Sequence, residues 1–431
     1  MFGAIADDLT GGLELASMLI ARGVPTTLSI GPGEPARYGV AHVFALKSRV
    51  APTAEALQAT LEALERLIEQ GARQIFFKYC ATFDSTPAGN IGPCAEAILD
   101  RLGARQALFA PALCETRRTV YQGHMFGGAQ LLGESPKRFD PLTPMTDSNL
   151  VRVLQAQSRK TVGLVDYAVI DRGPEAIRSH LDANIETSFF ICDTLYEHHF
   201  STLAAAIVDT PFVTGNSSVT AHLPPLWFKN GLVPSPAPVR LDGVEGPGAV
   251  LVGSLADQTA AQLDRFAQLN GVFTIDVAEA YAGRDIVAEA KRFAEAAIAS
   301  GRDFAISTAL PQERVESLQA VYGRLEIAAK VEAILSEVAR SIVFDFGVRR
   351  LVVAGGETSG SVVRALGVTD LDVGPYREPG FSRSVAVQPF PIALMLKSGK
   401  LGSPDIFASA LDDMRRPIAQ EPLLDRWPPK V

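Results

Sequence analysis

The sequence has no uninterrupted apolar run of the roughly 18–20 residues that a membrane-spanning helix needs. Its N-terminus also lacks the basic segment and apolar core of a secretory signal peptide. The four cysteines, Cys80, Cys94, Cys114 and Cys192, lie far apart and form no Cys-x-x-Cys pair, which argues against a disulfide framework or a zinc site. We therefore expect a soluble, cytoplasmic protein with reduced thiols.

Excess positive charge is absent as well. The chain has 40 lysines and arginines against 48 aspartates and glutamates, which gives a net charge of −8 at pH 7. A protein that binds nucleic acid normally presents a basic face, so we expect no nucleic-acid partner and no membrane partner. Small anionic ligands held by individual lysines stay compatible with this balance. A homodimer is expected only because it is the commonest assembly of soluble enzymes.

Length and hydrophobic pattern together predict an α/β protein. At 431 residues the chain exceeds what one hydrophobic core usually supports. Apolar β-rich runs alternate with longer segments of helical periodicity, which is typical of mainly parallel sheets. In the N-terminal half we predict strands at Phe2–Ala6, Thr26–Ile30, Val43–Leu46, Ile75–Phe77, Ala107–Ala110, Thr161–Val165, Phe189–Ile191 and Phe212–Thr214, and helices at Leu13–Arg22, Thr53–Gln70, Ala95–Leu102, Ser148–Ala156, Pro174–Asp182 and Leu195–Val208.

Proline and glycine concentrate between Leu223 and Gly248, where no periodicity persists. We interpret residues 223–248 as a linker between domain 1–222 and domain 249–431. The predicted fold is therefore two doubly wound α/β domains with mainly parallel sheets and an interdomain cleft, a frequent place for ligands. The second domain is expected to contain strands at Ala249–Val252, Val272–Ile275, Phe304–Ser307 and from Leu351, and helices at Ala256–Leu269, Ile286–Ser300 and Leu325–Phe346.

The most informative motif is LVVAGGETSG at Leu351–Gly360, where a short apolar strand runs into glycines and hydroxyl residues before a helix start. Free backbone N–H groups and a helix N-terminus at the carboxyl end of a strand favour an anionic phosphate. The motif is not a Walker A loop, because no lysine follows the glycines, and it lacks GxGxxG spacing. The alternative is a plain tight turn with Thr358 or Ser359 as the helix N-cap.

Two further turns in the C-terminal half have the same character. One strand ends at Gly253 and Ser254, and Ser254 is either only a helix N-cap or part of the same crevice. The stretch LKSGKLG supplies Lys397 and Gly399 after another strand. Three such turns in one domain indicate a nucleotide-binding site.

The first strand ends in IADDLTGG, which places Asp7 and Asp8 directly before a helix start. A carboxylate there can cap the helix, accept a proton from a substrate hydroxyl, or hold the Mg²⁺ that accompanies nucleotide phosphates. Because side chains alternate in direction along a strand, we expect only one of the two to point into the site.

A polar loop, KYCATFDSTPAGNIG, begins at the strand end that carries Lys78. FALKSRV adds Lys47 and Arg49 at the same edge of the sheet. A sugar acid needs a cation for its carboxylate, and hydroxyl and amide groups for its several OH groups. The alternative is an Asx or ST turn followed by an N-cap. The loop offers Asp84, Ser85, Thr86 and Asn90 for this purpose.

The adjacent histidines His198 and His199 lie on a predicted helix and therefore face different directions. That placement does not suit an i, i+4 metal pair, and we expect both to be structural or exposed. The sequence identifies no metal ligands.

With these motifs in view, the chain resembles the four-carbon acid sugar kinase family over nearly its whole length. The likeness rests on GAIADDLTGGLELA, KYCATFDSTPAGNIG, GGETSGSVVRALGV and LMLKSGKLG, in that order. Within the family, the second motif together with LKSR looks closest to the 3-oxo-tetronate kinases. The resemblance implies ATP-dependent phosphorylation of the C4 hydroxyl of 3-oxo-tetronate, with Mg²⁺ bridging the phosphates.

The resemblance also implies roles for individual residues. Lys78 would stabilise charge on the substrate or in the transition state, and Asp8 or Asp84 would act as the base. Closure of the two domains would bring the substrates together. On the nucleotide side the matching residues are Ser254, Gly356, Glu357, Thr358, Ser359 and Gly399. On the sugar side they are Asp7, Asp8, Lys78, Asp84, Ser85, Thr86 and Asn90, with Lys47 and Arg49 nearby.

Some positions depart from the family's common pattern. Ala81, Glu357 and Lys400 stand where relatives often have Ser, Asp and Asn, and the stretch around Gly380 lacks their Pro-Gly-Val-Pro form. Three other functions stay open: a D-threonate or D-erythronate 4-kinase, a nicotinamide-dependent sugar-acid dehydrogenase, and a non-enzymatic sugar-acid sensing protein. The dehydrogenase fits the doubly wound pattern but not the glycine spacing. The sensing protein leaves three phosphate-type turns without a purpose.

Overall fold

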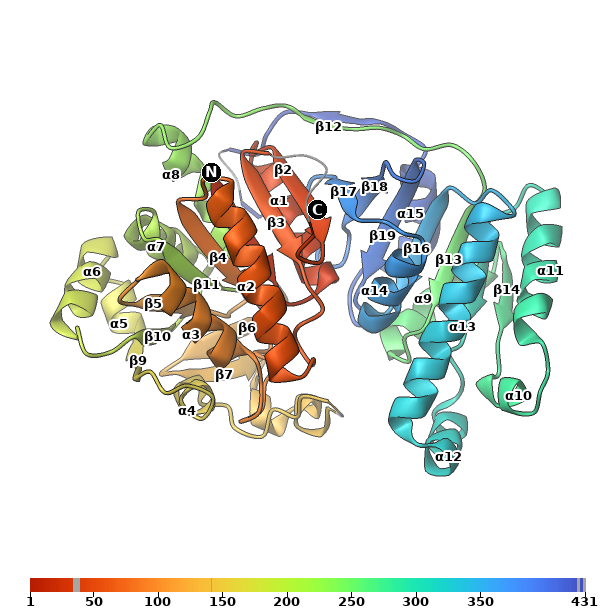
Figure 1. Ribbon diagram of the computed structural model, residues 1–431, viewed down its shortest axis with the longest axis horizontal. Coiled ribbons are helices and arrows are strands. Elements are labelled where there is room, and N and C mark those ends of the chain that lie inside the picture. The colour runs from red at the N-terminus through yellow and green to blue at the C-terminus, as the bar shows by residue number, and fades with distance from the viewer. Residues whose placement is uncertain (34–38, 141, 425–426, 429–431) are drawn as a thin grey trace. The chain divides into compact units, whose positions relative to one another are not determined.

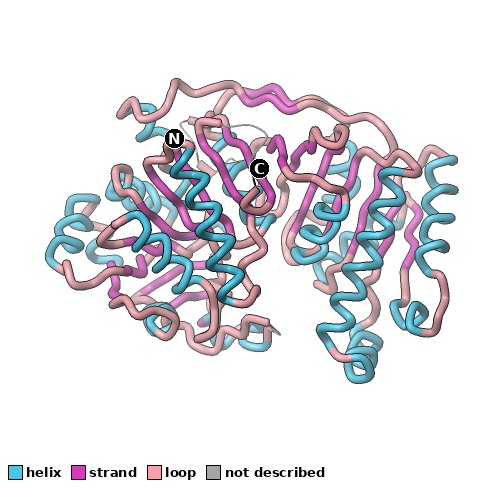
Figure 2. The backbone as a smooth tube through the Cα atoms, in the orientation of Figure 1, coloured by secondary structure: helices cyan, strands magenta, loops and turns pink. Residues whose placement is uncertain are grey.

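The computed structural model describes residues 1–33, 39–140, 142–424 and 427–428. It divides into two compact units, Met1–Pro238 with the described residues after Gln420, and Val239–Gln420. In both units strands alternate with helices (Figure 2). Within the described residues, every helix is too short or too polar to cross a membrane. Residues 425–426 and 429–431 of the predicted domain 249–431 lie outside the described residues.

The main sheet of the first unit matches the predicted alternation closely, and the bounds of three strands are those predicted. Its strands are β1 (Phe2–Ala6), β2 (Thr26–Ile30), β3 (Ala41–Ala45), β4 (Gln74–Lys78), β5 (Ala107–Ala110), β9 (Val162–Val165), β10 (Phe189–Cys192) and β11 (Phe212–Gly215). Its helices are α1 (Leu9–Ala21), α2 (Thr53–Glu69), α3 (Ile91–Leu102), α4 (Leu150–Gln155), α5 (Tyr167–Ile170), α6 (Pro174–Ala183), α7 (Glu197–Ile207), η4 (Ser218–His222) and α8 (Pro224–Lys229).

These strands lie in the order β2-β3-β1-β4-β11-β5-β10-β9 and pair in parallel. The chain passes from β1 to β2 and β3 on one side, and then resumes at β4 on the other side of β1. Helices α2 and α3 pack together on the near face in Figure 1. Ligands of doubly wound sheets bind at the carboxyl ends of strands where the order reverses, so the residues after β1, β3 and β4 form the expected site.

An antiparallel excursion leaves this sheet between β5 and α4, and the sequence analysis did not predict it. Strands β6, β7 and β8 pair antiparallel, and Gln122 and Gly123 turn the chain between the first two with φ of 49° and 72°. The excursion matters because its last element carries Lys137 to the polar loop after β4. It consists of η1 (Cys114–Thr116), β6 (Arg118–Tyr121), β7 (His124–Gly127), β8 (Gln130–Leu131), η2 (Leu132–Glu134) and η3 (Pro136–Phe139).

The second unit has a separate set of elements. Its strands are β12 (Val239–Leu241), β13 (Gly248–Val252), β14 (Gly271–Thr274), β15 (Phe304–Ser307), β16 (Arg350–Ala354), β17 (Asp370–Val373), β18 (Arg383–Ala386), β19 (Ile392–Lys397) and β20 (Ile418–Gln420). Its helices are α9 (Asp257–Ala267), α10 (Val277–Tyr281), α11 (Ile286–Ala299), α12 (Gln312–Tyr322), α13 (Arg324–Phe344), α14 (Gly356–Ala365) and α15 (Ile406–Asp413).

Its sheet has the order β14-β15-β13-β16-β19-β18-β17, in which the first five strands are parallel and β18 runs antiparallel to both neighbours. The chain passes from β13 to β14 and β15 on one side, and then resumes at β16 on the other. The reversal between β13 and β16 again marks the expected ligand site. Predicted doubly wound sheets are thus confirmed in both units.

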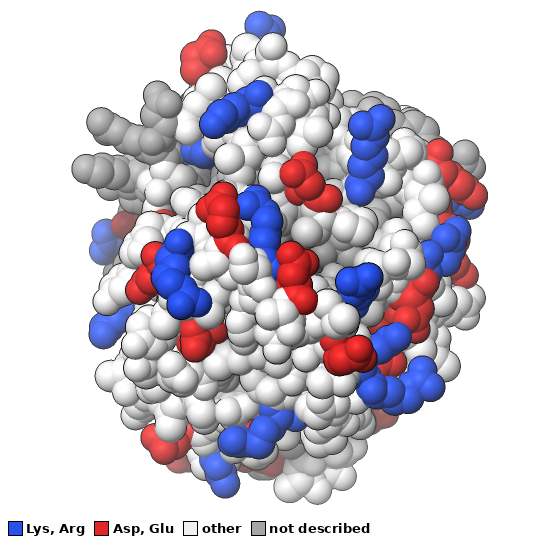
Figure 3. Space-filling view, turned by 90° about the vertical axis from the view of Figure 1, so that its left-hand side faces the viewer, with Lys and Arg blue, Asp and Glu red and all other residues white. Residues whose placement is uncertain are grey.

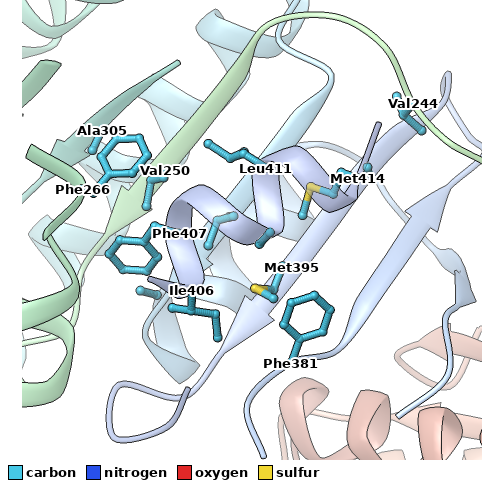
Figure 4. Close-up of a cluster of buried hydrophobic side chains, with 14 of the residues drawn as sticks. Val244, Val250, Phe266, Ala305, Phe381, Met395, Ile406, Phe407, Leu411 and Met414 are labelled. Carbon is cyan, nitrogen blue, oxygen red and sulfur yellow. The ribbon is translucent and has the colours of Figure 1, made fainter. Parts of the chain in front are cut away.

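A hydrophobic core fixes α9 and α15 to this sheet. Phe266 of α9 and Phe407 of α15 contact edge to face, with their ring centroids 6.3 Å apart. Figure 4 shows Ile406 of α15 near Met395 of β19, and Leu411 farther along α15 belongs to the same buried cluster. In Figure 1, α13 and α14 pack together on the near face of the sheet. Helices therefore cover both faces, as a doubly wound sheet requires.

The segment between the two halves carries regular structure, contrary to the prediction. Helix α8 begins at Pro224 and strand β12 begins at Val239, both within residues 223–248. Proline fits the first turn of a helix because its missing N–H would have no acceptor there. Strand β12 pairs with β20, a partner almost 180 residues away that local periodicity could not indicate. The two compact units divide between these elements, at Pro238 and Val239.

Charge on the face drawn in Figure 3 is mixed. Lysine and arginine side chains alternate there with aspartates and glutamates over a largely uncharged surface. The charged side chains that the sequence pointed to lie instead at the carboxyl ends of the central strands.

Candidate functional site

The turn after β3 brings Arg49 onto the carboxylate that follows β1. Arg49 Nε donates to Asp7 Oδ2 at 2.9 Å, and Nη2 donates to Asp7 Oδ1 at 2.8 Å. The Asp7 carbonyl also accepts the backbone N–H groups of Ser48 and Arg49. Burial raises the pKa of Asp7, although the Arg49 guanidinium opposes the shift. The guanidinium and the backbone therefore fix the end of β1 to the end of β3.

Asp8 contacts the same guanidinium, with Arg49 Nη2 at 3.0 Å from Asp8 Oδ1. It is also the N-cap of α1, where it accepts from the Gly11 N–H at 2.8 Å and from the Thr10 hydroxyl at 2.7 Å. Burial opposes ionisation of Asp8, but Arg49, Lys78 and these hydrogen bonds outweigh it and lower its pKa. Both carboxylates reach Arg49, although the Asp7 side chain is 5% exposed and that of Asp8 25%, so the expectation that only one of them points into the site stays a prediction.

Lys78 ends β4 and lies beside the cap of α1. Its side chain is 3% exposed, its ammonium donates to Tyr79 O at 3.0 Å, and Glu14 Oε2 is 3.9 Å away. A Cβ on Gly11 would lie 2.9 Å from Lys78 Nζ and 2.5 Å from Asp8 Oδ1. Glycine at this position therefore lets α1 approach the lysine, which explains the Gly-Gly pair in the first motif.

Glu14 was not identified from the sequence, whereas Ser217 belongs to residues 215–218 after the last predicted strand of the first domain, for which a linker turn and a substrate loop were both open. Ser217 is fully buried after β11, and its hydroxyl donates to Glu14 Oε2 at 2.8 Å. Glu14 lies two turns into α1, on the face that Lys78 approaches. The i, i+3 spacing from Gly11 to Glu14 would have suggested this face, but it is also the spacing of ordinary core positions.

Asp84 is held by a lysine from the antiparallel excursion. Lys137 Nζ lies 2.7 Å from Asp84 Oδ1 and 2.8 Å from Asp140 Oδ2. Thr82 donates to the same Asp84 oxygen at 2.6 Å, whereas Asp84 Oδ2 accepts no hydrogen bond from the described residues. Asp84 thus has one oxygen anchored and one available. Lys137 was not predicted, because about 50 residues separate it from Asp84 along the chain.

The thiol of Cys80 lies between the two carboxylate groups. The Asp84 N–H donates to Cys80 Sγ at 3.0 Å. Burial raises the pKa of Cys80 to about 11, with Asp84 adding to the shift and Arg49 opposing it. Cys80 is therefore a protonated thiol near neutral pH that accepts the backbone N–H of Asp84.

The remaining residues of the polar loop divide into supporting and exposed groups. Asn90 donates to the carbonyls of Ser48 and Ala51 at 2.7 and 2.8 Å, so it holds the turn that carries Arg49. It occupies the N-cap position of α3 without capping through its side chain. Ser85 is buried and accepts from Gln157 Nε2 at 2.7 Å. Asn90 and Ser85 thus shape the loop from beneath.

Ser85 and Thr86 line a cavity of about 230 Å³. The opposite wall includes Met145, Asp147 and Arg152, and the last two form an ion pair at 2.7 Å. Its volume suits a small ligand better than a drug-sized one. Lys47, by contrast, is exposed, so of the two cations predicted after β3 it is Arg49 that contacts the carboxylates.

In the second unit, the turns after β13, β16 and β19 interlock closely. A Cβ on Gly399 would lie 2.0 Å from Ser254 Oγ, and a Cβ on Gly253 would lie 2.1 Å from Thr358 Oγ1. The Ser254 hydroxyl accepts from the Ala256 N–H at 3.2 Å, but the N-cap of α9 is Ala256. Ser254 therefore belongs to the contact between turns and is not the helix cap.

Helix α14 presents an uncapped N-terminus to this group of turns. Its N-cap is Gly355, with φ of 128° and no side-chain hydrogen bond, so the alternative of Thr358 or Ser359 as cap is wrong. Ser359 is fully buried and donates back to Gly355 O at 2.7 Å. Gly356 and Glu357 are exposed, and the space around Gly356 is open. Open first-turn N–H groups suit an anionic oxygen.

Lys397 at the end of β19 was named in the sequence analysis as part of the third turn, but no role was assigned to it there. It is fully buried, and its ammonium donates to Thr259 Oγ1 at 3.3 Å. Thr259 in turn donates to Gly399 O at 2.7 Å. The lysine was visible in the motif LMLKSGKLG, but its burial was not, since five apolar residues before it fit either a buried or a half-buried strand.

One histidine is buried and the other exposed, as predicted, but the two do not face apart: their ring centroids lie 4.5 Å apart, and with Asp171 they bring three potential ligand atoms within 4.8 Å of one another. His199 is buried, His198 is exposed, and Asp171 approaches both. His199 Nδ1 accepts from the Leu195 N–H at 3.2 Å, and Nε2 lies 2.9 Å from Asp171 Oδ1. Both ring nitrogens are thus used in hydrogen bonds that suit a neutral imidazole, and the cluster acts as a structural contact between α5 and α7.

Comparison with known proteins identifies the family. The family model of a sugar-binding N-terminal domain matches residues 2–223, and that of a nucleotide-binding C-terminal domain matches residues 249–407. A 3-oxo-tetronate kinase from Pseudomonas fluorescens is 43% identical over 96% of this chain and 97% of its own length. The chain belongs to the four-carbon acid sugar kinase family. The 3-oxo-tetronate kinase of Escherichia coli K12, another relative in this family, is 37% identical over 88% of this chain and 98% of its own length.

Two solved structures share the fold of this chain over nearly its whole length. A crystal structure from Salmonella typhimurium LT2 has a TM-score of 0.84 and 34% identity, covering 95% of this chain and 98% of that chain. A Haemophilus influenzae protein has a TM-score of 0.76 and 32% identity, covering 96% of this chain and 100% of its own. The family's fold therefore extends over both units.

Proposed function

We propose that this protein is an ATP-dependent kinase that transfers the γ-phosphoryl group of ATP to the C4 hydroxyl of 3-oxo-tetronate, giving 3-oxo-tetronate 4-phosphate and ADP. The observation that carries the proposal is the 43% identity to a 3-oxo-tetronate kinase over 96% of the chain. The residues at the carboxyl ends of the strands also support it. In the first unit these residues are rich in charged side chains, and in the second unit they offer open backbone N–H groups.

We assign the acid sugar to domain 1–222 and the nucleotide to domain 249–431. The matched models of a sugar-binding and a nucleotide-binding domain support this division. The donor sets agree as well. Carboxylates, an amide and hydroxyls after β1, β3 and β4 suit a polyol, whereas glycine turns and a helix N-terminus suit phosphates.

On the acid-sugar side, Lys78 is the proposed cation for the substrate. Its ammonium has three protons, and Tyr79 O takes one of them, so two remain for an anionic oxygen. Arg49 is committed to Asp7 and Asp8. We therefore assign Arg49 the role of holding the carboxylates, and Lys78 that of neutralising charge as the phosphoryl group is transferred.

We propose Asp84 as the base that takes the C4 hydroxyl proton, with Asp8 as the alternative. Asp84 Oδ2 is available, while both oxygens of Asp8 already accept hydrogen bonds from Thr10 and Gly11. A general base needs a free lone pair within reach of the proton. Ser85 and Thr86, which line the neighbouring cavity, would contact the substrate's hydroxyl groups, and Asn90 would keep the Arg49 turn in place.

ATP and Mg²⁺ fit the residues of the second unit in different ways. The uncapped first turn of α14 at Gly356–Ser359, with Ser254 and Gly399 beside it, offers N–H and hydroxyl donors for phosphate oxygens. Carboxylates in these turns are Glu357 and Asp257, both exposed. We therefore expect Mg²⁺ to be held mainly by phosphate oxygens and water, with Glu357 within the same turn. Bound Mg²⁺ supplies charge neutralisation for phosphoryl transfer.

The test is release of ADP from Mg-ATP by the purified protein with 3-oxo-tetronate, D-threonate, D-erythronate or L-threonate, and with no acceptor. We expect turnover with 3-oxo-tetronate and a background rate in the control. Turnover with a tetronate alone would keep the kinase and change the acceptor. If no acceptor releases ADP, the kinase proposal is wrong, and reduction of a nicotinamide cofactor or ligand binding indifferent to ATP would identify the remaining alternatives.

A further inference from the structure

A fully buried lysine with no carboxylate partner among the described residues lies beneath the proposed nucleotide turns. Lys397 is 0% exposed at the end of β19. Its ammonium donates to the Thr259 hydroxyl at 3.3 Å and lies 5.7 Å from the centre of the Phe407 ring. Burial alone lowers the pKa of Lys397 to about 8. A buried ammonium without an anion destabilises a fold, so packing does not explain this residue.

The contact of Lys397 continues directly into the turn that follows it. The same Thr259 hydroxyl donates its own proton to Gly399 O at 2.7 Å. A hydroxyl can accept from an ammonium and donate to a carbonyl at once. Lys397 therefore orients the Thr259 hydroxyl toward Gly399, because the ammonium occupies a lone pair and leaves the proton for the carbonyl.

Helix α9 holds the rest of this turn in the same way. Gln262 donates through Nε2 to the carbonyls of Gly402 and Ser403, both at 3.0 Å, and Gln258 donates to Gly402 O at 2.8 Å. The turn thus has several carbonyls fixed by α9. Gly399 is distinct because the space for its Cβ is filled by Ser254 Oγ, so its position sets the contact between the turns after β13 and β19.

We propose that Lys397 is a positioning residue for the nucleotide, acting through Thr259 to fix Gly399 against Ser254. The inference rests on the proposed function, since it assigns a purpose to a residue beneath the turns assigned to ATP. It predicts that Lys397 lowers stability while raising nucleotide affinity. A lysine that served packing alone would not raise nucleotide affinity.

The experiment compares Lys397→Met and Lys397→Arg with Thr259→Val and Thr259→Ser. MgADP binding is measured by calorimetry, KM for ATP and for the acid sugar by turnover, and Tm by thermal unfolding. We expect Lys397→Met to weaken MgADP binding and raise KM for ATP by about tenfold, as loss of one charge-assisted hydrogen bond predicts, with KM for the acid sugar unchanged and Tm not lowered. Thr259→Val should do the same, and Thr259→Ser, which keeps the hydroxyl, should restore binding.

Lys291→Met is the matched control, because Lys291 lies on α11 of the same unit and is partly exposed. It should bind MgADP as the wild type does. Unchanged MgADP binding by Lys397→Met would overturn this inference but leave the proposed function in place. Weak binding accompanied by a lowered Tm would also overturn it, because the lysine would then be structural. A wild type that binds no MgADP and releases no ADP would overturn the proposed function and this inference with it.

Discussion

The two sheets carry different groups at the place where their strand order reverses. After β1, β3 and β4 the first unit gathers Asp7, Asp8, Arg49, Lys78 and Glu14, most of them paired with one another. After β13, β16 and β19 the second unit gathers glycines and hydroxyls around one buried lysine. Under the proposed function, side chains would select the ligand in the first unit, and the backbone would receive it in the second.

The difference between the two sites follows from the chemical groups by which each proposed ligand is distinguished from similar molecules. Phosphates look alike in every nucleotide, so backbone N–H groups at a helix N-terminus suffice and glycines let them come close. A four-carbon acid differs from its relatives in the placement of hydroxyl and oxo groups, which only side chains can distinguish. The first site should therefore respond strongly to changes of charge, and the second to changes of shape.

Asp84→Asn should break the first site most severely. The substitution preserves shape and removes the charge that is proposed to accept the proton, so we expect turnover to fall by about 10²–10⁴-fold with Tm nearly unchanged. Asp140→Asn is the comparison, because Asp140 shares Lys137 with Asp84 but lies outside the loop. Steady-state ADP release measures both. Equal turnover in wild type and Asp84→Asn would leave Asp8 as the base.

Arg49→Met should convert the first site from a paired cluster into two buried carboxylates without their cation. Breaking a buried ion pair costs about 3 kcal/mol, somewhat less here because Arg49 is 23% exposed. Urea unfolding should therefore show a lower midpoint, and the loss should shrink as the pH falls, because Asp7, whose pKa is raised by burial, takes up a proton. An unchanged midpoint at pH 7 would mean that the pair contributes little to the unit.

Local sequence determined more of the second site than of the first. The turns at Ser254, Gly356 and Gly399 each follow a strand whose apolar run was evident, so their meeting could be predicted from the parallel topology. The first site also contains Glu14, Lys137 and Ser217, which reach it from a helix interior, an antiparallel excursion and a later strand. Nothing local marks them, because their partners are distant in the chain.

The same reasoning explains which elements were missed. The missed strands are short, and they pair antiparallel or at sheet edges. Their apolar runs are therefore weak. They are β12, β17, β18 and the strands β6, β7 and β8 of the excursion. The segment 223–248 was interpreted as a linker from its prolines, yet proline is favoured at the start of a helix such as α8. Composition alone cannot separate a proline that begins a helix from one in a loop.

Gly399→Ala sharpens the comparison, since it changes shape without changing charge. Its Cβ would meet Ser254 Oγ at 2.0 Å, so the turns must separate, and we expect KM for ATP to rise by about fivefold to tenfold, equivalent to 1–1.4 kcal/mol. Removing the hydroxyl in Ser254→Ala/Gly399→Ala should recover part of the loss. Gly127→Ala, where the space for a Cβ is open, should leave KM unchanged. If Gly399→Ala alone kept the wild-type KM for ATP, the contact between the turns would not be needed for ATP binding.

Lys397→Met gives the most discriminating effect, because it should make the second unit more stable. The ordinary pKa of lysine is 10.5, and burial lowers that of Lys397 to about 8, so the folded state binds its proton less tightly than the unfolded state. At pH 7 that difference corresponds to about 3 kcal/mol against the folded state, and Met at this position avoids it. As pH rises from 8 to 10.5 the folded lysine loses its proton first, so the wild type should gain stability relative to Lys397→Met.

The measurement is the difference in urea midpoint between the two proteins from pH 7 to pH 10. A difference that stays constant over this range would mean that the ammonium is solvated or paired, and that the second site, like the first, neutralises its own charge.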